Sequence, residues 1–132
     1  MRTRHGVIPL LLNADVIEIA GWSESPLAEL FDIQLFSCFA GCAKPDPEIY
    51  QLCLRQLDLT AADCLFVGDG GSNELVGARE AGLTTVLMSG VVAELWPEKI
   101  PPRLPAADYH IRRIPEVLEL IQRAQPDDAG DP

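Results

Sequence analysis

The stretch Leu65-Phe66-Val67-Gly68-Asp69-Gly70-Gly71-Ser72-Asn73-Glu74-Leu75 carries the strongest structural signal in the chain. It starts as an apolar run of strand length, turns through glycines directly after an aspartate, and enters a helix that carries a second acid. In a parallel sheet this order places Asp69 at the carboxyl end of a strand, which is the edge where α/β proteins build their sites. Asp69 and Glu74 would suit a hard cation such as Mg²⁺, and the backbone N–H groups of residues 70–72 would suit an anion. The alternative is a plain turn in which Asp69 only caps the helix.

Short apolar runs alternate along the chain with amphipathic segments. The runs are Val7–Asn13, Ile33–Ser37, Cys64–Gly68 and Thr84–Met88, and Tyr109–Ile111 is predicted as a short last strand. Continuous apolar runs of this length are typical of parallel strands that are covered on both faces. The pattern therefore predicts an α/β fold, in which helices pack on a parallel sheet.

The stretch Gly41-Cys42-Ala43-Lys44-Pro45-Asp46-Pro47-Glu48-Ile49-Tyr50 is the second informative segment. It predicts a helix that begins at Pro47, with Asp46 as its cap. The core-facing stripe of this helix consists of Ile49, Cys53 and Leu57, with Leu52 and Leu54 beside them. Because Lys44 follows a strand and precedes this helix, its ammonium group is expected at the carboxyl edge of the sheet, where it would balance carboxylates or a phosphate. The alternative is a solvated lysine in a loop.

Two further helices are predicted in the second half of the chain. One runs from Ser72 to Gly82, and Gly77 within it permits close packing on the sheet. The other runs from Pro115 to Arg123, and its apolar face consists of Ile114, Val117, Leu118 and Ile121. Residues Val92–Pro105 contain four prolines and are predicted as an irregular connection.

The composition is that of a globular protein with a marked acidic balance. The 132 residues carry 20 acidic and 10 basic side chains, a net charge of −10, so neither nucleic acid nor a membrane surface is expected as a partner. The apolar run Val7–Leu12 is too short to span a bilayer and lacks a convincing cleavage site, so a cytoplasmic location is expected. One domain is expected over residues 1–124, followed by a disordered acidic tail at residues 125–132.

The four cysteines fit no metal-binding or redox spacing, and buried, reduced thiols are expected at each of them. They are Cys38, Cys42, Cys53 and Cys64.

Together, the two informative segments resemble the haloacid dehalogenase (HAD) superfamily, whose members are mostly magnesium-dependent phosphohydrolases acting through an aspartyl-phosphate. Lys44-Pro45-Asp46-Pro47-Glu48-Ile49-Tyr50 is similar to the third family motif, and residues 67–75 are similar to the fourth, the acidic metal-binding loop. The resemblance covers roughly residues 6–121 and implies a three-layer, Rossmann-like parallel sheet with helices on both faces.

The resemblance also assigns roles to individual residues. It implies that Asn13 and Lys44 bind the phosphate of a small phosphorylated molecule, that Lys44 is catalytic, and that Asp69 and Glu74 hold Mg²⁺ weakly. The loop that supports these side chains consists of Gly68, Gly70, Gly71, Ser72 and Asn73.

The sequence departs from the family pattern in three ways. In the acidic loop, Asn73 stands where close relatives often have Asp, which leaves Asp69 and Glu74 as the metal carboxylates. Leu12 stands where the second motif should offer a Ser or Thr to the phosphate. The first motif, an Asp-x-Asp that supplies the nucleophile and the general acid, does not occur before Asn13, and the first strand and the cap domain are absent with it. Asp15 is the nearest acid, but it is expected at a helix start for capping reasons. The isolated chain is therefore expected to be inactive, because losing the attacking group costs several orders of magnitude in rate.

Two functions stay open at this point. The chain is either part of a HAD-type hydrolase, through a truncated reading frame or a half that needs another chain for its nucleophile, or a non-catalytic binding or assembly domain of the same fold. The resemblance places the missing strand between Val7–Asn13 and Cys64–Gly68, so the sheet is expected to be open there. A homo-oligomer or a complementing chain is expected to fill this position, in preference to direct pairing of the two strands or aggregation through the free edges.

Overall fold

The computed structural model describes residues 8–124. The predicted acidic tail, residues 125–132, and the first residue of the first predicted strand lie outside the described residues.

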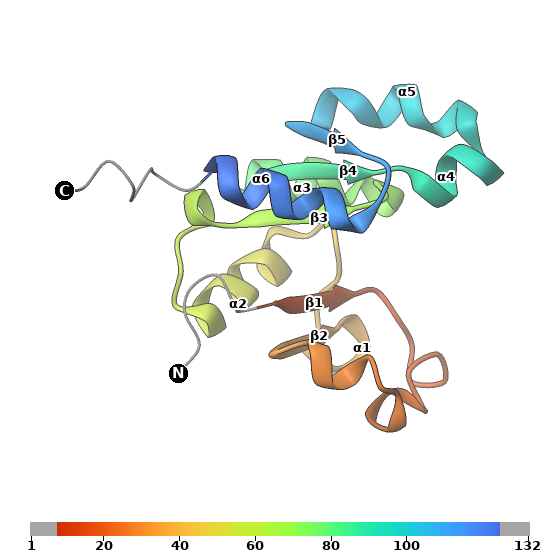
Figure 1. The fold of residues 1–132 in the computed structure, drawn as a ribbon. Coiled ribbons are helices and arrows are strands. Elements are labelled where there is room, and N and C mark those ends of the chain that lie inside the picture. The colour runs from red at the N-terminus through yellow and green to blue at the C-terminus, as the bar shows by residue number, and fades with distance from the viewer. Residues whose placement is uncertain (1–7, 125–132) are drawn as a thin grey trace.

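The five predicted strands all form, and they form two parallel sheets (Figure 1). The strands are β1 (Pro9–Leu12), β2 (Ile33–Phe36), β3 (Leu65–Gly68), β4 (Thr84–Met88) and β5 (Tyr109–Ile111). Strands β1 and β2 make one sheet with Leu11 opposite Leu35, and the other sheet has the order β3-β4-β5 with Val67 opposite Val86. No ladder joins β1 to β3 within residues 8–124, so the sheet is open where the missing strand was expected.

Helices and single 3-10 turns connect the strands. The α-helices are α1 (Ser37–Ala40), α2 (Pro47–Leu57), α3 (Glu74–Glu80), α4 (Gly90–Leu95), α5 (Ile100–Arg103) and α6 (Val117–Ala124). The 3-10 turns are Trp22–Glu24, Ala28–Leu30, Ala61–Asp63, Gly71–Asn73, Pro97–Lys99, Leu104–Ala106 and Ile114–Glu116. No helix in the described part of the chain is long and apolar enough to cross a membrane.

The helices form layers on the two faces of the strands, as predicted (Figure 1). Helices α2 and α3 cover one face, where Ile49, Tyr50 and Ala78 are fully buried in a cluster that also receives Leu11 and Phe66. Helix α6 covers the other face of the β3-β4-β5 sheet, where Leu120 packs with Val86 and Ile111. Residues of both sheets therefore share one core layer with α2 and α3.

The predicted irregular connection Val92–Pro105 is wrong, because most of it is helical. Helix α4 is followed by the turn Pro97–Lys99, by α5 and by the turn Leu104–Ala106. Prolines lie in the first turn of each of the last three elements. A proline in the first turn of a helix loses no backbone hydrogen bond, because the N–H there has no partner within the helix. The many prolines of this segment therefore indicate helix starts.

The predicted apolar face of the last helix is also partly wrong. Ile114 and Leu118 are 58% and 64% exposed, whereas Val117 and Leu120 pack against the sheet. The α-helix begins only at Val117, because residues 114–116 form a separate 3-10 turn. Its buried face therefore contains Val117 and Leu120, which are three residues apart.

Cysteine burial follows the prediction at one position and contradicts it at another. Cys53 is buried and Cys42 and Cys64 are half-buried, but Cys38 on the short helix α1 is exposed. Burial, and secondarily the neighbouring Cys64, raises the pKa of the Cys53 thiol to about 11. Burial, followed by the charge of Asp63, also raises the pKa of Cys64. Both thiols are therefore protonated at neutral pH.

Candidate functional site

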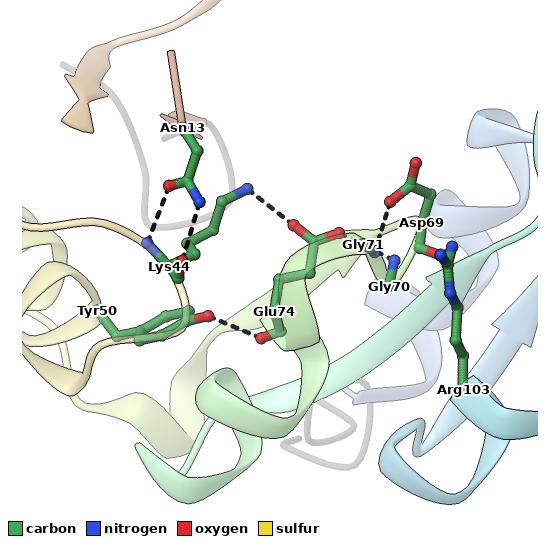
Figure 2. Close-up of polar contacts among 8 residues, drawn as sticks. All are labelled: Asn13, Lys44, Tyr50, Asp69, Gly70, Gly71, Glu74 and Arg103. Carbon is green, nitrogen blue, oxygen red and sulfur yellow. Dashed lines mark hydrogen bonds and ion pairs between the residues drawn. The ribbon is translucent and has the colours of Figure 1, made fainter. Parts of the chain in front are cut away.

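The carboxyl ends of β1, β2 and β3 meet around the loop that precedes α2 (Figure 2). Asn13, directly after β1, makes two hydrogen bonds with the Lys44 backbone: its Nδ2 donates to the carbonyl and its Oδ1 accepts from the N–H, each at 2.9 Å. Next to it, the Ser37 hydroxyl after β2 accepts from the Ala14 N–H at 3.0 Å and donates to the Ala14 carbonyl at 3.2 Å. Asn13 thus fixes the position of the Lys44 loop, and Ser37 fixes the residue that follows Asn13.

Lys44 and Glu74 form the central ion pair of the site (Figure 2). Lys44 Nζ lies 2.7 Å from Glu74 Oε1, and the two side chains are only 11% and 8% exposed. The other carboxylate oxygen of Glu74 accepts the Gly70 N–H at 2.9 Å. A Cβ at position 68 would collide with the Glu74 carboxylate, so a glycine at the end of β3 is what allows Glu74 to reach Lys44.

Tyr50 holds the first turn of α3, the helix that begins at Glu74. Its hydroxyl donates to the Glu74 backbone carbonyl at 2.7 Å, and its ring is fully buried against Phe66. Burial, followed by the charges of Glu74 and Asp46, raises the pKa of the Tyr50 phenol. The phenol therefore stays neutral and acts as a hydrogen-bond donor.

The acidic loop between β3 and α3 has an unusual backbone. Gly70 has φ of 88°, and Ser72 and Asn73 also lie in the left-handed region with φ of 55° and 53°. This geometry corrects the predicted helix start at Ser72: the α-helix begins at Glu74, and residues 71–73 form a separate turn. Two consecutive non-glycine residues in the left-handed region are costly, and such backbone conformations cluster at functional sites.

Asp69 is the exposed acid of this loop. Its Oδ1 accepts the Gly71 N–H at 2.8 Å, and its backbone carbonyl accepts a hydrogen bond from Arg103 Nη1 at 2.7 Å. The aliphatic part of Arg103 lies over Gly70, where an added Cβ would be 2.7 Å from Arg103 Cδ. Figure 2 shows Arg103 reaching Asp69 from the side of the loop opposite to Lys44.

The donors present are of the kind that Mg²⁺ prefers. The second carboxylate oxygen of Asp69 takes part in no hydrogen bond or ion pair with a described residue, whereas both oxygens of Glu74 already have partners. The described residues contain no group of three or more acidic, histidine or cysteine side chains that would hold a metal by themselves. Mg²⁺ usually keeps several waters and takes one or two carboxylates together with substrate phosphates, so Asp69, with Glu74 behind it, fits this ion in chemistry.

The structure brings three of the four predicted ligands into direct contact: Asn13, Lys44 and Glu74. Asp69 lies in the same loop as Gly70, whose N–H bonds Glu74, but in the described part of the chain no hydrogen bond or ion pair joins Asp69 to Lys44. The roles assigned to these residues toward phosphate and Mg²⁺ stay predictions.

Three contributors to the site were not predicted from the sequence: Ser37, Tyr50 and Arg103. Tyr50 lies in the first turn of α2, within the recognised segment 44–50, so a signal for it was present. Arg103 is 34 residues away from Asp69 within a segment that had been predicted as irregular, and no sequence pattern links the two.

A family model for haloacid dehalogenase-like hydrolases matches residues 9–82. The glyceraldehyde 3-phosphate phosphatase of Pyrococcus furiosus is 32% identical over 98 residues, which are 74% of this chain and 39% of that protein. Acyl-CoA dehydrogenase family member 10 of Mus musculus is 45% identical over 56 residues, which are 42% of this chain and 5% of that protein.

Solved structures show the same fold. A HAD phosphatase from Thermococcus onnurineus superposes with a TM-score of 0.71 at 20% identity, over 87% of this chain and 50% of that one. A dehalogenase superposes with a TM-score of 0.67 at 23% identity, over 91% of this chain and 50% of that one. This chain thus spans half the length of both structures.

Proposed function

The chain belongs to the haloacid dehalogenase-like hydrolase family, and from this we propose that it forms the phosphate- and metal-binding part of a magnesium-dependent phosphohydrolase. The observation that carries the proposal is the nearly buried pair of Lys44 and Glu74 at the joined strand ends, with exposed Asp69 on the adjoining loop. The curated phosphatase that this chain resembles supports a phosphate monoester as the substrate class.

The residues of the site have separate tasks in this proposal. An ammonium group has three N–H donors, and Glu74 takes one of those of Lys44, so two remain for phosphate oxygens. Asn13 holds the Lys44 backbone in place, and Glu74 fixes the acidic loop through Gly70. When bound at Asp69, Mg²⁺ would supply charge neutralisation for the phosphate oxygens.

We propose further that the isolated chain does not turn over phosphate esters. The sequence contains no aspartate before Asp15, and Asp15 accepts the Glu18 N–H at 2.8 Å as the cap of an exposed turn. The non-catalytic binding domain is the second candidate function. It is favoured by the fact that Glu74 already balances the charge of Lys44 within the chain.

The experiment is thermal unfolding in Mg²⁺ with increasing inorganic phosphate, combined with an assay on an aryl phosphate. Phosphate at ten times its dissociation constant adds about 1.4 kcal/mol of stability, which corresponds to a rise in Tm of about 5 °C for a chain of this size. The rise should vanish in Lys44→Met and persist in Lys99→Met, whose lysine contacts only the ring of Trp96.

An equal rise in the two variants would contradict phosphate binding at Lys44. Turnover of the aryl phosphate that disappears in Asp69→Asn would contradict the inactivity of the isolated chain and would leave the hydrolase function standing.

A further inference from the structure

The peptide group between Asp69 and Gly70 is held from both sides (Figure 2). Its carbonyl oxygen accepts a hydrogen bond from Arg103 Nη1 at 2.7 Å, and its N–H donates to Glu74 Oε2 at 2.9 Å. The C=O and the N–H of a trans peptide point in opposite directions, so the two side chains approach from opposite sides of the loop. A cation at the oxygen and an anion at the N–H make both bonds charge-assisted, and such bonds are roughly twice as strong as neutral ones. The two bonds therefore fix the orientation of this peptide plane.

Arg103 contacts this peptide with its aliphatic part as well as with its guanidinium group. A Cβ at position 70 would lie 2.7 Å from Arg103 Cδ and 3.2 Å from Arg103 Cγ. Gly70 also has φ of 88°, a conformation that favours glycine. The Gly70 backbone is therefore covered directly by the Arg103 side chain, and the absence of a Cβ at position 70 is what lets the guanidinium group reach the carbonyl beside it.

Arg103 bonds the backbone of Asp69 and leaves its carboxylate free of an ion pair. The Asp69 carboxylate accepts the Gly71 N–H, and within residues 8–124 no ion pair joins it to Arg103. A guanidinium group that paired with this carboxylate would occupy the oxygens that a metal ion needs. By bonding the main chain, Arg103 orients the residue and does not compete for its side chain.

The segment that carries Arg103 is anchored on α3 and β4. Arg79, in the last turn of α3, donates to the Pro105 carbonyl at 2.7 Å. The fully buried Thr85 of β4 donates to the Ala106 carbonyl at 2.6 Å. Helix α3 thus anchors both sides of the held peptide, because its first residue supplies the carboxylate at the N–H and its last turn secures the segment that supplies the guanidinium group.

The loop after Asp69 needs such support from outside. Ser72 and Asn73 have φ of 55° and 53°, and residues in the left-handed region persist only where the surrounding structure holds them there. Glycine at position 70 allows many backbone conformations, so the loop does not fix its own peptide planes. The contacts that Glu74 and Arg103 make with the 69–70 peptide supply this constraint.

We propose that Arg103 is a positioning residue of the cation site, which directs the Asp69 carboxylate by holding the 69–70 peptide. This inference rests on the proposed function, which assigns Mg²⁺ to Asp69. Without the guanidinium group the peptide rotates at Gly70, its N–H leaves Glu74, and the carboxylate loses its fixed direction. Partners that orient the ligands of a metal site typically change metal affinity by about 10- to 100-fold.

Position and charge predict opposite effects of removing this side chain. Arg103 is a cation next to a site for a cation, so through its charge alone its removal would strengthen Mg²⁺ binding. Through its role in positioning Asp69, its removal weakens Mg²⁺ binding. The direction of the change in the Mg²⁺ dissociation constant therefore separates the two.

The test is a Mg²⁺ titration of the full ¹⁵N-labelled chain, followed by NMR through the amide signals of residues 70–71. The dissociation constant should rise about tenfold in Arg103→Met, which keeps an unbranched stem over Gly70. It should rise less in Arg103→Lys, which keeps a cationic donor. Arg55→Met removes an exposed guanidinium group from α2, the same change of charge, and should keep the wild-type dissociation constant. Without metal, the Gly70 N–H should exchange faster in Arg103→Met than in wild type, because its bond to Glu74 is no longer held.

Unchanged or tighter Mg²⁺ binding in Arg103→Met would overturn the positioning role and leave the metal site at Asp69 standing. An equal loss of affinity in Arg55→Met would assign the effect to net charge and overturn it too. A wild-type chain without a saturable response at residues 70–71 would overturn the proposed metal site and this inference with it. If Arg103→Met does not fold, Arg103→Gln takes its place, with the same expected rise and the same contradicting result.

Discussion

Tyr50 connects the core of this protein to its candidate site. It is fully buried, it lies in the cluster that both sheets share, and its hydroxyl bonds the carbonyl of Glu74 at the first turn of α3. The ring and the hydroxyl thus belong to the packing and to the polar network at the same time. The position of the Glu74 carboxylate depends on this contact as well as on Lys44.

Substitution Tyr50→Phe should lower stability at neutral pH by about 1 kcal/mol, since the hydroxyl is lost and the ring remains. Burial, then Glu74 and Asp46, raises the pKa of Tyr50 above its ordinary value of 10.0. The unfolded chain therefore loses this proton near pH 10 while the folded chain keeps it, so the stabilising contribution is complete below pH 10 and is lost as the pH rises further.

Urea unfolding at pH 7 and pH 10.5 measures this effect. The stability difference between wild type and Tyr50→Phe should shrink at the higher pH. The control is Tyr109→Phe, since Tyr109 is 41% exposed and should change little at either pH. A difference for Tyr50→Phe that is constant with pH would show that the phenol is not held neutral by the fold.

At the scale of elements, α3 is fixed by a close approach to the Lys44 loop. A Cβ at Gly77 would lie 2.6 Å from the Pro45 carbonyl oxygen and 2.9 Å from Tyr50 Cε2. The sequence had predicted that Gly77 allows packing on the sheet, but the close partners are this loop and α2. The glycine brings Glu74 and Lys44 together by letting their two elements approach.

Gly77→Ala should destabilise the protein by about 1–3 kcal/mol, because the new methyl group overlaps backbone and a buried ring. At an unconstrained helix position, Gly→Ala stabilises a protein by roughly 1 kcal/mol. The sign of the change in unfolding free energy therefore tells whether the space at Gly77 is occupied. Urea unfolding compares it with Gly21→Ala, where nothing lies within 4 Å of the new Cβ. Equal or higher stability of Gly77→Ala would contradict the close approach.

Local patterns in the sequence predicted the strands well and the connections poorly. Strands β4 and β5 have the predicted bounds, because a continuous apolar run is a local property. Helices α4 and α5 were missed because prolines in a first turn look the same as prolines in a loop until the fold is known. The left-handed Ser72 and Asn73 were missed because neither residue type requires that conformation.

In the site, too, residues placed by local sequence patterns could be predicted, and a contact that depends on the path of the later chain could not. Asn13, Lys44 and Glu74 could be predicted to converge because each follows a strand of one parallel layer. The contact of Arg103 with Asp69 depends on how two later helices return over the loop, and sequence spacing does not encode that path.

At the scale of the whole molecule, two parallel sheets share one helical layer and meet at a polar site. The chain carries a net charge of −10, yet both ends of its central ion pair are nearly buried. The carboxylate with an uncommitted oxygen at this site is exposed Asp69, held in place by Gly71 and Arg103. Cation binding at the open strand ends should therefore depend on Asp69 first.

The most direct measurement is a Mg²⁺ titration of the ¹⁵N-labelled chain, followed through its amide signals by NMR. The Gly70 and Gly71 signals should shift saturably with weak affinity, on the order of 1 mM, because few protein ligands replace the water of a reluctantly dehydrated ion. The shifts should be lost in Asp69→Asn and kept in Glu119→Gln, a matched removal of one exposed charge on α6. Shifts that persist in Asp69→Asn, or that are absent from residues 70–71 while other acidic segments respond, would contradict a metal site at the ends of these strands.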